Sequence, residues 1–191
     1  MFGVSLGIID SGGAGSAPAS FEPIQTLTAA GGETSLSFTS IPSTYKHLQI
    51  RGISRASVAS TGTSNVSLTL NSDTGSNYSV HRVNTYDGTL FNVQGLANWP
   101  YIFLPAQPND STTANCFMAS IIDLIDYAST TKNKTVRVFG GSETNVIDNT
   151  SSTALISGGW YSTSAVTSVQ VKANTSSFKA GSTFALYGIK G

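Results

Sequence analysis

The sequence predicts an all-β protein, a jelly-roll-like antiparallel β-sandwich of about 8–11 short strands with an extended N-terminal arm. Ser (29) and Thr (23) make up 52 of the 191 residues, whereas only 20 residues are charged. Hydroxyl groups therefore carry most of the polarity, which is typical of pleated surfaces and unusual for helical ones. Strand-like runs recur with turn residues between them. No segment keeps an apolar period of 3.6 residues for more than one or two turns.

Residues 1–20 form the expected arm, and residues 21–191 form the expected single β-sandwich domain. The arm begins with a short apolar stretch and continues into a tract rich in Gly, Ala and Ser. Such a segment does not fold alone, so its apolar residues must bury against the domain or against a partner subunit. The sequence leaves both possibilities open for Phe2, Val4, Leu6, Ile8 and Ile9.

Eleven strands are expected from Phe21 onward. The first two, Ile24–Thr28 and Thr34–Thr39, flank the turn residues Ala29–Glu33 and are predicted to form a hairpin. Ser120–Tyr127, which overlaps the end of the expected strand Asn115–Leu124, is ambiguous between helix and strand, but its β-branched residues favour a strand. The remaining expected strands are Tyr45–Ser54, Asn65–Leu70, Ser79–Tyr86, Thr89–Gln94, Asn115–Leu124, Thr135–Gly140, Ala154–Trp160, Thr167–Lys172 and Thr183–Ile189.

Many short strands without helices to cover a parallel sheet favour a sandwich or barrel, and repeats typical of a propeller or β-helix are absent. Period-two placement then predicts the core. The expected core residues are Leu48, Ile50, Leu68, Phe117, Val136, Val138, Val169, Val171, Phe184 and Leu186.

No catalytic motif is evident. The sequence has two histidines, His47 and His81, but no serine lies in a nucleophile motif that could act with either of them. Cys116 lies in an apolar run typical of a small core residue. The segment Asn71–Gly75 faintly resembles a calcium loop but lacks its acidic density, so we expect a plain turn. We therefore predict no enzymatic activity, no cofactor and no metal site.

The charge balance bears on partners. Ten basic residues offset ten acidic ones, and the basic residues do not cluster. Nucleic acids and anionic membrane surfaces both attract basic patches, so neither is an expected partner. No apolar run is long enough for a membrane span.

The aromatic residues Trp99, Tyr101, Trp160 and Tyr161 allow two interpretations. An aromatic face fits the apolar face of a sugar ring, so the four residues are candidates for a glycan-stacking platform. Aromatic residues near strand ends are more often part of a sandwich core. The sequence alone does not separate these interpretations.

Three segments carry a resemblance to a known group of proteins. Residues 38–51, FTSIPSTYKHLQIR, followed by Arg55, resemble a pattern found in small virion proteins of tailed bacteriophages. Met1–Ser11 is similar to the start of those proteins, and Phe178–Ile189 is similar to their C-terminal strand. The resemblance implies a structural component of the virion and identifies no binding residue.

Within that group, the resemblance implies a capsid decoration or cement protein on the outer surface of the phage head. Its partners would be the major capsid protein and other copies of itself, as a dimer or trimer, with the arm as anchor. The alternative is a tail-associated or fibre protein, an adhesin that binds host-surface carbohydrate. Because the chain has no long repetitive shaft, its length favours decoration.

Overall fold

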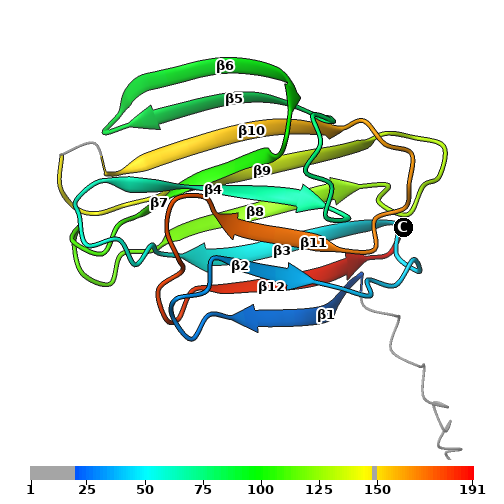
Figure 1. Cartoon of the computed structure of the whole chain (residues 1–191), viewed down its shortest axis with the longest axis horizontal. Coiled ribbons are helices and arrows are strands. Elements are labelled where there is room, and N and C mark those ends of the chain that lie inside the picture. The colour runs from blue at the N-terminus through cyan, green and yellow to red at the C-terminus, as the bar shows by residue number, and fades with distance from the viewer. Residues whose placement is uncertain (1–19, 148–149) are drawn as a thin grey trace, which may run out of the picture.

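The computed structural model describes residues 20–147 and 150–191, which build a two-layer sandwich (Figure 1). The described residues contain twelve antiparallel strands and no helix, so the predicted all-β sandwich is confirmed with more strands than expected. The strands are β1 (Phe21–Thr28), β2 (Ser35–Phe38), β3 (His47–Ser54), β4 (Thr63–Leu70), β5 (Tyr78–Tyr86), β6 (Thr89–Trp99), β7 (Ile102–Pro108), β8 (Met118–Ile125), β9 (Lys134–Ser142), β10 (Ser152–Trp160), β11 (Val169–Ala173) and β12 (Thr183–Ile189).

One sheet has eight strands in the order β1-β12-β3-β8-β9-β10-β5-β6, and the other has four in the order β2-β11-β4-β7. Consecutive strands pair directly in the hairpins β5–β6, β8–β9 and β9–β10. Every other connection between consecutive described strands passes from one sheet to the other. The core lies between the two sheets.

Alternation within the strands fills that core. In β8 and β9, every second residue from Met118 and from Lys134 turns inward, as expected of a sheet that packs on the core with one face only. Nine of the ten predicted core residues are buried. The exception is Phe117, which is half-buried because it precedes β8, where Met118 takes the inward position.

The predicted β1–β2 hairpin is wrong. β1 pairs with β12 in the large sheet, whereas β2 pairs with β11 in the small one. The turn between them is tied elsewhere, because the Ala29 amide donates to the Ser182 carbonyl and the Gly32 amide to the Phe178 carbonyl. Gly31 and Gly32, with φ of 111° and 100°, let the chain turn this corner between the sheets.

Strand β7 was not expected from the sequence. Its residues include Pro105 and Pro108, which cannot donate to a neighbouring strand and so weaken the strand pattern. β7 is an edge strand of the small sheet, paired on one side only with β4. Proline is tolerated at such an edge. Of the predicted arm, only Ser20 lies within the described residues.

Candidate interaction surface

The outer face of the large sheet carries a row of exposed apolar side chains. Register places one such residue on each of five neighbouring strands, from β8 through β9, β10 and β5 to β6. Their exposed fractions range from 43% to 69%. Soluble proteins rarely leave a contiguous apolar patch of this kind uncovered. We call it the apolar row, and its members are Ile121, Phe139, Leu155, Val83 and Val93.

The outer face of the small sheet is different. Its outward strand positions include Ser37, Gln170 and Lys172, and the Gln170 side-chain amide donates to the Ser37 hydroxyl at 3.2 Å. Over β2 and β11 this face has the polar character expected of a sheet face in contact with water. Toward β7 it is covered, because the outward residues Ser67 and Phe103 are 2% and 7% exposed. The apolar row is therefore a property of one sheet, and the chain as a whole does not share it.

Two further rows flank the apolar row. On one side, Gln49, Asp123 and Arg137 follow one another across β3, β8 and β9, and the Gln49 amide donates to the Asp123 carboxylate at 2.8 Å. On the other side lie the small residues Ala119 and Gly141. Asp123 and Arg137 thus place charge along one border, Arg51 stands in register with Ile121 at the β3 end of the row, and the opposite, low border has only small side chains.

The low border is part of a shallow depression of about 1030 Å³, whose lining includes Ile53, Phe117, Ile121 and Phe139. Glycine is required in its floor. A Cβ on Gly141 would lie 2.1 Å from the Ser152 carbonyl oxygen, which the backbone cannot relieve. The backbone of β10 thus passes too close to this position for any side chain.

Arg55 holds one wall of the depression. Its side chain is only 2% exposed, and its guanidinium donates to the carbonyls of Asp110 (3.1 Å), Thr112 (3.1 Å), Thr113 (2.9 Å) and Cys116 (2.6 Å). The Asp110 carboxylate lies 3.7 Å from Arg55 Nε and also pairs with Lys179, whose hydrogen bond lowers the pKa of that carboxyl. Four carbonyls gathered on one guanidinium fix the loop that leads into β8.

Cys116 and Phe117, at the end of that loop, were expected in the core. Both are half-buried and line the depression instead. The cause is the loop geometry that Arg55 imposes, because it brings the Cys116 carbonyl inward and leaves the two side chains at the wall. The expectation of a core position is therefore wrong for both residues.

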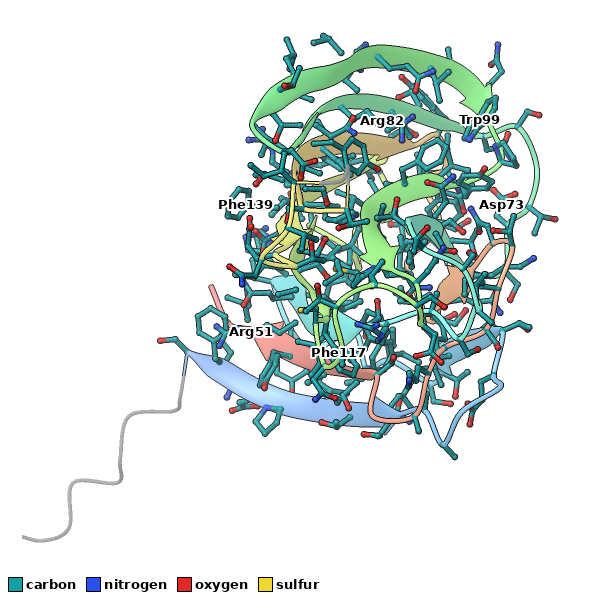
Figure 2. The ribbon with its side chains drawn as sticks, turned by 90° about the vertical axis from the view of Figure 1, so that its left-hand side faces the viewer. Arg51, Asp73, Arg82, Trp99, Phe117 and Phe139 are labelled. Atoms are coloured by element: carbon teal, nitrogen blue, oxygen red, sulfur yellow. The ribbon has the colours of Figure 1, made fainter. Side chains whose placement is uncertain are left out.

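Arg51 lies at another rim of the depression. Its guanidinium carbon is 5.6 Å from the ring centre of Phe21 and 5.3 Å from that of Tyr187, and its Nε donates to the Gln49 side-chain oxygen at 2.8 Å. It forms no ion pair with a carboxylate among residues 20–147 and 150–191. Figure 2 shows Arg51 and Phe139 on one side of the molecule, opposite Asp73 and Trp99.

An ionic cluster closes one end of the outer face, just after Ile125. Asp126 accepts from Lys132 at 2.7 Å and lies 2.9 Å from the Lys46 ammonium. The hydrogen bonds from Lys132 and Lys46 hold the pKa of Asp126 down at about 2. His47 lies beside them, on the outer side of β3, and its Nδ1 accepts from the Asp126 amide at 3.0 Å.

The four aromatic candidates do not form one platform. Trp160 is 3% exposed, its indole donates to the Asp73 carboxylate at 2.6 Å, and it stacks on Tyr78. It is therefore a core residue with no free face for a sugar. Trp99 and Tyr101 pack on each other and on Phe103, with ring centres 5.0–6.2 Å apart.

Tyr161 is the exposed member of the four aromatic candidates.

The nearby segment Asn71–Gly75 is the expected turn. Both carboxylate oxygens of Asp73 accept hydrogen bonds, from the Gly75 amide, the Asn77 side chain and Trp160. Its oxygens are thus committed to the turn and to the core.

Within the described ranges, no group of three or more His, Cys, Asp or Glu side chains is arranged to hold a metal ion. No helix among these residues is long and apolar enough to cross a membrane. The expected arm residues Phe2, Val4, Leu6, Ile8 and Ile9 lie outside the described residues.

The apolar row was missed in the sequence, although a signal for it exists. Three of its members stand beside an inward-facing apolar residue, in Ile121-Ile122, Val138-Phe139 and Leu155-Ile156. Such pairs break strict alternation and are typical of strands covered on both faces.

The sequence was also compared with known proteins. No protein-family model matches the chain, and no curated protein matches it.

Proposed function

We propose that this chain is a non-enzymatic structural protein of a tailed-bacteriophage virion, a capsid decoration or cement protein on the outer surface of the head. The observation that carries the proposal is the apolar row, a sheet face suited to contact with another protein. The resemblance of residues 38–51 and of the two chain ends to small virion proteins supplies the biological setting.

The chemistry of the apolar row suits stable, salt-insensitive attachment. Burying a large apolar side chain from full exposure contributes about 1.5–3 kcal/mol, and the five row residues, which are 43–69% exposed, can each gain a part of this before ordering costs are subtracted. Because the row carries no charge, salt has little to screen. A protein that binds only the assembled state stabilises that state by mass action, without any chemistry.

The proposed partners are the major capsid protein and neighbouring copies of this chain, with a dimer or trimer as the unit. The depression beside the row would receive side chains of the partner, and the wall fixed by Arg55 gives it a defined shape. The arm provides a second, extended point of attachment through the apolar residues of its first nine positions.

The test is to add the purified full chain to undecorated capsids and to count the copies bound per particle, at low and at high salt. We expect many copies, in a fixed ratio to capsid subunits, and little change with salt. No binding to capsids together with binding to host-cell glycans would contradict the proposal and favour the tail-associated adhesin. Tyr161, Trp99 and Tyr101 would then be the first residues to substitute.

A further inference from the structure

The first nine residues of the chain carry a strand-like pattern of their own. Phe2, Val4, Leu6 and Ile8 occupy every second position, with only Gly3, Ser5 and Gly7 between them. In an extended chain, alternate side chains point to the same side. Phe2–Ile8 would then present one apolar edge about 20 Å long, at about 3.3 Å per residue.

The apolar row has a matching length. It crosses five strands, and four spacings of about 4.8 Å give about 19 Å. Both the row and Phe2–Ile9 are uncharged. The first charged side chain of the arm is Asp10, and Arg51 at the rim of the depression forms no ion pair with a carboxylate of the described residues. Apolar length and charge are thus both complementary.

The arm joins the domain close to this face. Phe21, the first residue of β1, is exposed and contacts Arg51, and the start of β1 lies on the same side as Arg51 and Phe139 (Figure 2). The backbone of Arg51 is about 16 Å from that of Phe21, because Arg51 is two strands away from β1 and four residues along β3 from His47, which is level with Phe21. The two long side chains bridge this distance. Residues 10–20 span up to about 36 Å when extended, so the connection is long enough.

We propose that Phe2–Ile9 of the same chain folds back over the apolar row and its depression in the free protein, with Asp10 facing Arg51. The same chain is favoured over a second copy because a short glycine-rich connection, with Gly12, Gly13 and Gly15, gives an effective concentration near the millimolar range. A partner that uses this face must displace the segment. The inference does not rest on the virion assignment.

Paramagnetic NMR on the full chain tests the proposal. Cys116→Ser removes the single native cysteine, and Ser5→Cys places a nitroxide label in the arm. We expect broadened signals at Ile121, Phe139 and Leu155, and sharp signals at the outward residues of β2 and β11 on the far sheet. Moving the label to Ser16 by Ser16→Cys should shift the broadening toward Phe21 and Arg51.

A matched pair of variants makes the test specific. Phe139→Thr with Leu155→Thr should abolish the broadening, whereas Gln170→Thr with Lys172→Thr on the small sheet should leave it unchanged. Should Cys116→Ser fail to fold, contacts between the Ile8 methyls and the Ile121 or Leu155 methyls in the unmodified chain provide the same readout.

Two results would overturn the inference. One is an outer face whose signals stay sharp with either label. The other is broadening that appears only between a labelled chain and a separate isotope-enriched chain, because the segment would then belong to a second copy. In both cases, undiminished binding to capsids would leave the proposed function standing.

Discussion

The two faces of the large sheet carry similar side chains and differ in what covers them. On β8, Ile122 is 1% exposed under the small sheet, whereas its neighbour Ile121 is 43% exposed. On β9 and β10, the buried residues Val138 and Ile156 stand next to the exposed residues Phe139 and Leu155. The same apolar chemistry serves the core on one face and lies open on the other.

This contrast teaches that burial in the isolated chain explains only half of the apolar pattern. An antiparallel sheet that meets water normally alternates apolar with polar residues, as β2 and β11 of the small sheet do. The large sheet departs from that rule on five neighbouring strands at one level. A second covering layer would explain the departure, and the proposals above assign this layer to the arm in the free protein and to a partner in the assembly.

The largest expected difference lies between two arginines four residues apart. Arg55→Met leaves four carbonyls and the Asp110 carboxylate without their donor, so we expect a loss of about 3–5 kcal/mol in the free energy of unfolding. Arg51→Met should lose less than about 1 kcal/mol, because its guanidinium rests on the exposed ring of Phe21 and the half-buried ring of Tyr187 and leaves no buried group without a partner. Urea unfolding of both variants measures the difference, and equal losses would break the comparison.

The isoleucine pair sharpens the comparison with identical chemistry. Ile122→Ala should lower the free energy of unfolding by about 2–5 kcal/mol, because it opens a cavity in the core. Ile121→Ala opens no cavity and should lower it by less than about 1 kcal/mol. The same urea series compares them. A loss at Ile121 as large as that at Ile122 would mean that Ile121 packs as closely as a core residue, which a segment folded over the row from outside does not explain.

The pH dependence of Tyr78 probes the covered side. Burial raises the pKa of Tyr78 to about 12 from an ordinary value of 10. Because the folded chain favours the protonated phenol, this stabilisation is complete below pH 10 and is lost as the pH rises toward 12. We expect a fall of about 2 kcal/mol over that window. Tyr78→Phe should flatten that limb of the stability profile, whereas Tyr161→Phe should leave it unchanged.

The smallest effect concerns the ionic cluster at the end of the outer face. Lys132 and Lys46 hold the pKa of Asp126 at about 2, below its ordinary value of 3.8. The stabilisation is present above pH 3.8 and is lost as the pH falls through about 2. Asp126→Asn should remove this acid-side dependence with a small change in midpoint, and 1 M salt should weaken it in the parent chain. Persistence of the dependence in Asp126→Asn would assign it to another carboxyl.

Local pattern predicted the strands well and their partners poorly. Alternation located the strand regions and the buried positions of β3, β9 and β12, because period two is a property of a few neighbouring residues. Pairing depends on distant segments. The turn at Gly31 and Gly32 suggested a hairpin, yet hydrogen bonds to Phe178 and Ser182 send the two strands into different sheets.

The candidate surface was hidden for a related reason. Ile121-Ile122 and Leu155-Ile156 can be assigned to either face until the register is known, and only the pairing of five strands lines the outer members up. The burial of Trp160 and Phe117 could not be judged from the local pattern either. Trp160 is held by its hydrogen bond to Asp73, and Phe117 follows the loop that Arg55 holds. These are contacts between residues far apart in the sequence.

The central claim is that the apolar row binds the partner. The most direct measurement compares the affinity of three full chains for undecorated capsids: the parent, the outer-face variant Phe139→Thr with Leu155→Thr, and the small-sheet control Gln170→Thr with Lys172→Thr. We predict at least about a tenfold loss for the outer-face variant, since about 1.4 kcal/mol of lost apolar contact suffices, and no change for the control. Parent-like affinity in the outer-face variant, with its fold intact, would contradict the claim.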